Sequence, residues 1–262
     1  MIFTEVWGFR WLFVNFLQRE IKNRYIGTIS GLFWVLLNPL ALLAIYWFVF
    51  AVVFRVSIPE MQGRDFIEFV AIGLWPWLAF QEGLQRGSIS IQGAEGLIKK
   101  VSFPHELLVY ASIVSTYLVH FTGFLLILLV MGISGKDIHF LALPAVFIIL
   151  IFQALFTMGM AMLFSALQVF VRDIEHFLTP MMMVWFYATP ILYTSNMVPQ
   201  QIRSVMAYNP MASYVDIVRD ALLNGVVNLN WQIAALAAGS IALFVFGRFI
   251  FRRLSPHFED FL

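Results

Sequence analysis

The sequence contains no cysteine, and only 12% of its 262 residues are charged. Without a thiol, the chain can form no disulfide bond, thiolate metal site or cysteine nucleophile. Soluble domains have about 25% charged and about 45 to 50% apolar residues, whereas 61% of this chain is hydrophobic. A water-facing fold could not bury so much apolar surface. We therefore expect an all-α, polytopic membrane protein.

The sequence also lacks an excess of charge of one sign. Sixteen Lys and Arg stand against 15 Asp and Glu, which gives a formal net charge of +1. Binding of a nucleic-acid backbone requires a strongly basic surface, so no nucleic-acid partner is expected. A secretory signal has basic residues ahead of its apolar stretch. Here residues 1–9 contain no basic residue, and Arg19, Lys22 and Arg24 follow the apolar start. We therefore expect the N-terminal segment to be retained.

Motifs for nucleotide binding and hydrolysis are missing as well. The nearest approach to a P-loop, Gly135-Lys136-Asp137, lacks both the leading glycine and the hydroxyl residue. The sequence has no H-E-x-x-H, no G-x-S-x-G and no His and carboxylate cluster at metal-ligand spacing. We expect a protein that is not an enzyme and has no cofactor or metal of its own, so energy for uphill transport would come from another subunit.

Six apolar stretches are long enough, or nearly so, to cross a hydrocarbon core that requires about 20 helical residues. Together they form one domain, residues 31–262, and their expected bounds are 31–54, 66–84, 106–131, 140–168, 177–193 and 231–251. The second and fifth are short and contain proline, which membrane helices tolerate where neighbours satisfy the freed carbonyls. An even number of spans places both termini on one side.

The distribution of Lys and Arg predicts which side this is. Eleven of the sixteen lie on the side of the termini: Arg10, Arg19, Lys22, Arg24, Arg86, Lys99, Lys100, Arg172, Arg248, Arg252 and Arg253. The other side has Arg55, Arg64, Lys136, Arg203 and Arg219. Cytoplasmic loops of membrane proteins carry the excess of basic residues, so both termini are expected in the cytoplasm.

Residues 1–30 are expected to form a cytoplasmic amphipathic helix at the membrane interface. Trp7, Trp11, Val14, Leu17 and Ile21 recur there at helical spacing, with polar residues on another face. This helix either anchors the chain to the membrane surface or binds a partner protein.

The connection between the last two spans is too long for an ordinary loop, and its apolar periodicity predicts short helices close to the membrane. Asn209-Pro210 divides it into two pieces or forms an ordinary turn. His120 is the ionisable residue at mid-membrane depth, and we expect a hydrogen bond between helices there rather than a proton relay.

The loop from Ile98 to Pro104 mixes basic and apolar residues just before the third span. It is either a topology signal followed by a helix start at Pro104 or a short coupling helix that binds a cytoplasmic partner.

Seven segments, taken in order, resemble the permease subunits of type-two ABC exporters, specifically the Wzm/TagG-like group that exports O-antigen and teichoic-acid polysaccharides. They are REIKNRY at 19–25, GLFW at 31–34, NP at 38–39, LIKKVSFP at 97–104, VRDI at 171–174, TPILY at 189–193 and NP at 209–210. The resemblance covers the whole chain.

This resemblance implies a homodimer in the bacterial inner membrane, with two copies of a separate P-loop ATPase that binds ATP and Mg. The implied substrate is a lipid-linked cell-surface polysaccharide. Coupling to the ATPase would depend on Lys99, Lys100, Val101, Phe103 and Pro104. Two gate helices are implied at 199–207 and 211–223, with Asn209 and Pro210 at the turn between them.

Aromatic residues in the first and fifth spans are candidates for the channel wall, because these spans line the channel in the resembling family. They are Trp34, Tyr46, Trp185, Tyr187 and Tyr193. Aromatic faces suit pyranose C–H groups, although interfacial or lipid contacts are the alternative for each. On one straight helix Tyr193 would lie about 80° and Tyr187 about 200° from Trp185, so Trp185 and Tyr193 are expected to share a face.

Two other functions stay open at this point. One is a permease of the same architecture that exports a small amphipathic molecule or lipid. The other is a channel or membrane enzyme that works without an ATPase.

Overall fold

The computed structural model describes residues 8–24, 33–55, 65–227 and 230–262, and over these ranges the chain is all-helical. Three helical segments are long and apolar enough to cross a membrane: Glu106–Ile133, Phe140–Phe170 and Trp231–Phe261. They contain the long helices α6 (Glu106–Ile133), α7 (Leu143–Phe170) and α11 (Trp231–Leu254). These helices agree with the third, fourth and sixth expected spans.

Helices also occupy the other three expected spans, but these are shorter or more polar. The first consists of α3 (Phe33–Tyr46) and the π-helical turns η1 (Trp47–Val53). The second is α4 (Phe66–Ile89), which continues beyond its expected end at residue 84 and carries Glu68 and Glu82. The fifth is α8 (Ile174–Tyr187).

The expected end of the fifth span at residue 193 is wrong, because α8 stops at Tyr187. Pro190 has no N–H for the carbonyl of Phe186, and a proline disfavours helical geometry in the residue before it. The 14 residues of α8 extend about 21 Å, which is less than the roughly 30 Å of a bilayer core.

After α8 the chain forms two short helices, as the sequence predicted. They are α9 (Gln200–Met206) and α10 (Pro210–Asn224), preceded by the 3-10 turn η5 (Ser195–Met197). Asn209 caps α10 and Pro210 occupies its first turn, where the missing N–H costs nothing. Gly225 ends α10 with a φ of 66°, a left-handed conformation that favours glycine.

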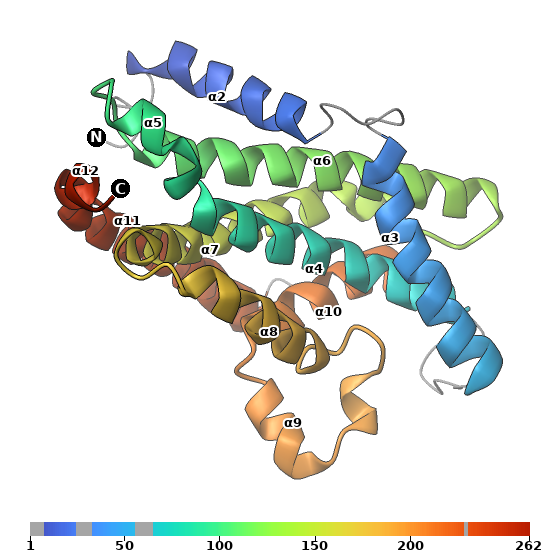
Figure 1. Cartoon of the computed structure of the whole chain (residues 1–262). Coiled ribbons are helices and arrows are strands. Elements are labelled where there is room, and N and C mark those ends of the chain that lie inside the picture. The colour runs from blue at the N-terminus through green and yellow to red at the C-terminus, as the bar shows by residue number, and fades with distance from the viewer. Residues whose placement is uncertain (1–7, 25–32, 56–64, 228–229) are drawn as a thin grey trace.

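Helix α4 lies at the centre of the fold and packs against α6, α7, α8 and α10 (Figure 1). Trp75, Trp77 and Phe80 on α4 are almost completely buried. On the outside, α11 lies along α7, and the two approach closely where Gly159 faces Gly247. A Cβ atom on Gly247 would lie 2.2 Å from the carbonyl oxygen of Gly159.

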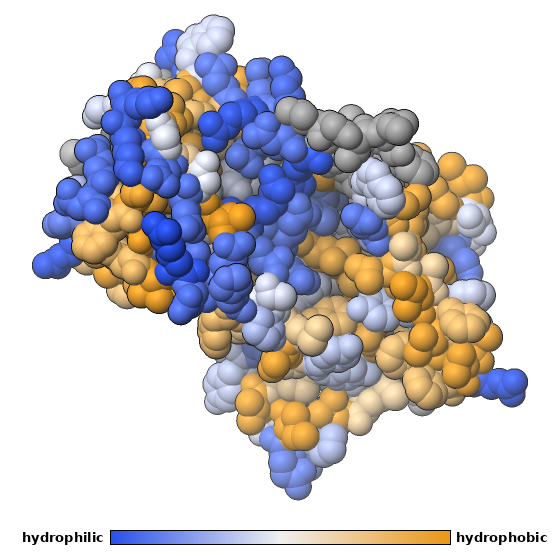
Figure 2. Space-filling view, viewed as in Figure 1, coloured by the Kyte–Doolittle hydropathy of each residue, from blue (hydrophilic) through white to orange (hydrophobic). Residues whose placement is uncertain are grey.

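One end of the molecule collects α2 (Arg10–Asn23), α5 (Glu95–Ile98) and α12 (Phe258–Phe261), as Figure 1 shows. We call these helices and residues 99–105 the basic end. Hydrophilic side chains are concentrated over α2 and α5 in Figure 2, whereas the region over α3 is mostly hydrophobic.

Helix α2 occupies the middle of the expected amphipathic helix, and residues 1–7 and 25–30 lie outside the described ranges. It rests on α6 through a face that includes the buried Phe16. Trp11 and Val14, from the expected apolar face, are exposed instead. That exposure fits a helix whose outer apolar face contacts lipid.

Candidate functional site

We call residues 98–104 the coupling segment, after one of the two roles that the sequence predicts for them. The short helix of that prediction is not found, because α5 ends at Ile98 and residues 99–104 form a turn and an irregular stretch. Helix α6 begins at Glu106, so the expected helix start at Pro104 is also wrong. Pro104 and His105 lie in the connection just before it.

Only part of the coupling segment faces outward. Lys99, Lys100 and Val101 are exposed, and Lys99 Nζ lies 2.7 Å from Glu95 Oε1. This hydrogen bond lowers the pKa of Glu95. Phe103, by contrast, is 8% exposed, and its ring centroid lies 5.4 Å from that of Phe16. Phe103 therefore attaches the segment to α2, while Lys99, Lys100 and Val101 remain exposed.

His105 lies at the same end of the molecule, just before α6. Its ring lies 5.3 Å from Phe103 and 6.1 Å from Phe258, measured between centroids. Burial lowers the pKa of His105, and the carboxylate of Glu259 opposes part of that effect. The neutral imidazole thus joins α12 to the segment before α6.

Charged side chains from α2, α4 and α6 form a cluster around Glu82. Its Oε1 lies 2.9 Å from Nη2 of Arg24, and its Oε2 lies 2.7 Å from Nε2 of His120. Nearby, Nη2 of Arg86 lies 3.2 Å from Oε2 of Glu20. The expected hydrogen bond between helices at His120 is confirmed.

This cluster was not predicted from the sequence, because Arg24 was expected in a helix at the membrane surface. A signal was present, since Glu82 and Arg86 are four residues apart on one helix face. The positions of Arg24 and His120, 96 residues apart in the numbering, gave no local indication that they would share a carboxylate.

A cavity of about 360 Å³ lies beside the cluster, between α3, α4 and α6. Its wall contains Arg24, Trp34, Asn38, Pro39, Leu42, Leu78, Gln81, Glu82, Gln85, Arg86, Val119 and His120. We call it the Trp34 cavity. It combines an aromatic ring, amides, charged groups and aliphatic side chains, and Trp34 is one of the aromatic residues predicted to line a channel.

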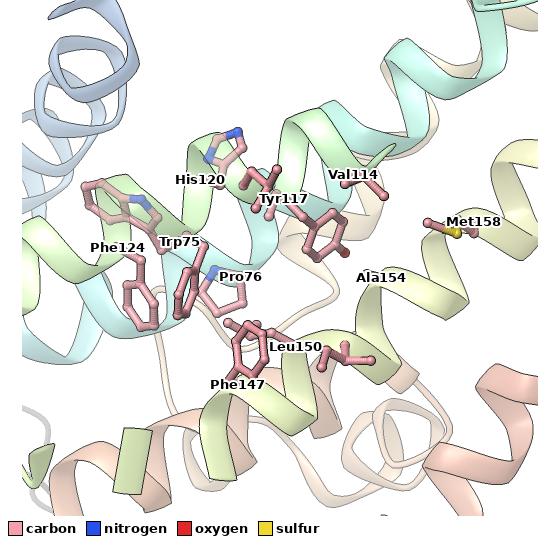
Figure 3. Close-up of a pocket in the computed structure, with 14 residues that line it drawn as sticks. Trp75, Pro76, Val114, Tyr117, His120, Phe124, Phe147, Leu150, Ala154 and Met158 are labelled. Carbon is pink, nitrogen blue, oxygen red and sulfur yellow. The ribbon is translucent and has the colours of Figure 1, made fainter. Parts of the chain in front are cut away.

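A second pocket, of about 130 Å³, lies between α4, α6 and α7 and is almost entirely apolar (Figure 3). Trp75 from α4, Phe124 from α6 and Phe147 from α7 are among the rings that line it. His120 borders both this pocket and the Trp34 cavity. The apolar lining suits a hydrocarbon group, whereas the Trp34 cavity offers polar partners.

Arg219 on α10 is buried, with 4% of its surface exposed, and it binds backbone carbonyls. Its Nε donates to Phe69 O at 3.1 Å, its Nη2 to Ile191 O at 2.6 Å, and its Nη1 to Pro190 O. Its guanidinium carbon also lies 3.6 Å from the centre of the Phe69 ring. Arg219 therefore fixes the irregular segment after α8 to α4 and α10.

Gly73 on α4 makes room for this arginine, because a Cβ there would lie 2.3 Å from Nη2 of Arg219. Asp216, the acidic residue one turn earlier on α10, is 3.8 Å away from Arg219 Nη1. From the sequence, Arg219 was expected only as a basic residue on the side opposite the termini, and no role was predicted for it.

Asn209 forms a second junction in the same region. Its Oδ1 accepts hydrogen bonds from Trp185 Nε1 at 2.9 Å and from the N–H of Met211 at 3.0 Å. Its Nδ2 donates to Ala188 O and to Thr189 Oγ1, each at 3.0 Å. The Asn209-Pro210 turn thus connects the end of α8 to the start of α10, which is more than an ordinary turn would do.

The predicted shared face of Trp185 and Tyr193 is wrong, because Tyr193 lies beyond the end of α8. Tyr193 instead donates its hydroxyl to Tyr187 O at 2.6 Å. Trp185 packs edge-on against Phe80, and Tyr46 stacks on Phe186. Tyr187 is the exposed residue among those at the end of α8. The five aromatic residues predicted to line a channel are therefore divided: Trp34 lines the Trp34 cavity, and the other four lie at or near the end of α8.

In the part of the chain that the structure describes, no group of three or more His, Asp or Glu side chains is arranged to hold a metal ion.

Comparison with known proteins gives one family. The family model described as ABC-2 type transporter matches residues 12–223. The O-antigen export system permease protein RfbA of Klebsiella pneumoniae is 32% identical over 251 residues, 96% of this chain and 95% of that protein. RfbA of Myxococcus xanthus is 32% identical over 261 residues, 98% and 97% of the two chains. The polysialic acid transport protein KpsM of Escherichia coli is 21% identical over 238 residues, 89% of this chain and 90% of that protein.

Proposed function

Because this chain belongs to the ABC-2 type transporter family, we propose that it is the membrane-spanning permease of an ATP-driven exporter of O-antigen-type polysaccharide. The observation that carries this function is the similarity to O-antigen export permeases from two organisms over nearly the full length of each chain. The chain itself is the permease, and ATP hydrolysis belongs to a separate partner with a P-loop.

The proposed architecture has six spans in the bacterial inner membrane, with α8 as the short fifth span and α9 and α10 as gate helices. Both termini lie in the cytoplasm. Clustering of α2, α5 and α12 at one end supports this orientation, because that end carries Lys99, Lys100 and the arginines of α2.

We further propose that the working unit is a homodimer with two ATPase copies. Apolar side chains are exposed along α3, η1 and α8, including Ile45, Phe48, Val184 and Tyr187. Exposed apolar surface of this kind suits lipid or a second protomer. On this hypothesis, Tyr46, Trp185, Tyr187 and Tyr193 lie at or behind the channel wall.

The ATPase is proposed to bind at Lys99, Lys100 and Val101, the exposed part of the coupling segment. Phe103 and Pro104 hold that surface in place, Phe103 through its contact with Phe16. A short exposed segment attached by a buried ring can transmit a movement of the ATPase to α2 and α6.

Complementation tests the function directly. The chain and its ATPase are expressed in a bacterium that makes an O-antigen-type polymer but lacks its own permease, and surface polymer is measured with an antibody. The wild-type chain should restore surface polymer and clear the polymer that accumulates inside. Failure of the wild-type pair, with both proteins present in the membrane, would contradict the proposal and favour export of a small amphipathic molecule.

Orientation is easy to test because the native chain has no cysteine. Single cysteines at Ser102 and Ser255 should be protected from an impermeant thiol reagent in intact cells, whereas one at Ser204 on α9 should react. Rapid labelling of the cysteine at position 102 in intact cells would contradict the proposed orientation.

A further inference from the structure

We propose that the Trp34 cavity is a sugar-binding subsite, which holds neutral, hydroxyl-rich units of the polymer on its way into the exporter. The inference rests on the proposed function and adds a location and a ligand class to it. The ligand would contact the ring of Trp34 and the amides of Gln81 and Gln85, all of which line the cavity.

The chemistry of the cavity wall matches a carbohydrate. Asn38, Gln81 and Gln85 each have an amide that can both donate and accept hydrogen bonds, as sugar hydroxyls do. Trp34 is 43% exposed and supplies an aromatic face for the C–H side of a pyranose ring. The volume of about 360 Å³ falls in the range of about 300 to 1,000 Å³ that is typical of small-ligand sites.

The charges around the cavity favour a neutral ligand over a phosphate group. Arg24 is paired with Glu82 at 2.9 Å, and Arg86 with Glu20 at 3.2 Å. Each positive charge therefore has a carboxylate beside it, and the wall presents little net positive charge for an anion. Charged groups that are already paired still offer hydrogen bonds to hydroxyl groups.

His120 positions an acidic group in the cavity wall. His120 is only 7% exposed, and its Nε2 binds Glu82. This pairing holds the carboxylate of Glu82, whose side chain is 38% exposed, at the cavity wall, where it can accept a hydrogen bond from a sugar hydroxyl.

The test uses the complete exporter in cells that make its polymer. A photo-crosslinking amino acid is placed at Gln85 in the cavity or, as the matched control, at Ile241, an exposed apolar position on α11. Irradiation should join the polymer to the chain at Gln85 and not at Ile241, as detected with an antibody against the polymer.

A second measurement follows export in substituted chains. Trp34→Ala should lower the export rate about twofold to tenfold, the range expected for loss of one aromatic contact. Trp34→Phe should recover most of that rate, and Trp231→Ala, which removes an exposed tryptophan from the start of α11, should leave it unchanged. Size-exclusion chromatography with the ATPase shows whether each variant still assembles.

These results separate the two proposals. If the wild-type chain exports polymer but Gln85 yields no polymer adduct and Trp34→Ala exports at the wild-type rate, the subsite is wrong and the exporter function stands. An adduct at Gln85 that contains lipid phosphate without polymer would also overturn the sugar assignment. If the wild-type chain exports no polymer, the function itself fails.

Discussion

The gate segment, residues 188–224, and the basic end use arginine in different ways. Arg219 in the gate segment binds three backbone carbonyls and an aromatic ring. Arg24 and Arg86, which join the basic end to α4, are paired with the carboxylates of Glu82 and Glu20. The gate arginine binds two carbonyls just after the end of α8 and one on α4, whereas the other two arginines neutralise acidic side chains between helices.

This difference follows from the local backbone. Carbonyls of a non-helical segment have no helical N–H to bind, and in a membrane an unsatisfied one costs several kcal/mol. A guanidinium has five N–H donors and can bind several carbonyls at once. Around Glu82, where the side chain is 38% exposed, water moderates the cost of losing a partner. We therefore expect the gate segment to be more sensitive to substitution.

The largest effect is expected for Arg219→Leu. It removes three hydrogen bonds from a charged group, each of which contributes about 1.5–3 kcal/mol, so thermal stability in detergent should fall sharply and export should be lost. Arg219→Lys should recover only part of the loss because an ammonium lacks the planar fork, and Gly73→Ala should reproduce it through the 2.3 Å clash.

Arg203→Leu is the matched control for that experiment. Arg203 on α9 also donates to carbonyls, those of Asn196 and Val198, but at a more exposed position. Its removal should have a much smaller effect on stability. Equal destabilisation by the two substitutions would show that burial does not distinguish these arginines.

At the basic end, Phe103→Ala should have the next largest effect on stability, about 3 kcal/mol for a buried phenylalanine. Lys100→Glu combined with Val101→Ala, at exposed positions, should leave stability unchanged and lower recovery of the ATPase in pull-downs. If the exposed pair has no effect on ATPase recovery, the docking surface lies elsewhere, for example on α2.

Glu82→Gln should destabilise the chain by about 1–2 kcal/mol, a value reduced because the side chain is partly exposed. The substitution removes the charge that Arg24 and His120 share. Glu82→Asp should restore part of the stability, and Glu95→Gln, in the exposed pair with Lys99, is the control that should change little. If Glu82→Gln lowered stability as much as Arg219→Leu, the gate segment would not be the more sensitive of the two regions.

Trp185→Phe tests how much one hydrogen bond contributes to the junction that Asn209 forms between α8 and α10. The change keeps an aromatic ring against Phe80 but removes the donor to Asn209 Oδ1. Loss of one partly buried hydrogen bond should cost about 1 kcal/mol. A thermal-melting measurement that shows no change would mean that Asn209 holds the junction through its other bonds.

The smallest effect concerns pH at the basic end. Because the folded-state pKa of His105 is lowered, protonation favours the unfolded state, and stability should fall as pH decreases below the unfolded value of about 6.5. The melting temperatures of wild type and His105→Asn should therefore converge between pH 7.5 and 5.5. A difference in melting temperature that stays constant from pH 7.5 to 5.5 would show that protonation of His105 does not affect stability.

Several features were predictable because they depend on neighbouring residues along the chain. Apolar length identified α6, α7 and α11, and Asn209-Pro210 correctly marked the break between α9 and α10. The effect of Pro190 was underestimated: treated as a bend that a membrane helix tolerates, it instead follows the end of α8. Likewise, apolar spacing in α2 did not reveal that Phe16 and Phe103 form the internal contact.

The sequence by itself determined the membrane class, the positions of the long helices and the asymmetric distribution of basic residues, because hydrophobicity, length and charge are properties of each segment. Only the tertiary structure decided the partners of the buried polar groups. Arg219 binds Phe69, 150 positions away in the chain, and Arg24 and His120 meet at Glu82. Such pairings depend on how helices cross in three dimensions, and no periodicity within one helix specifies them.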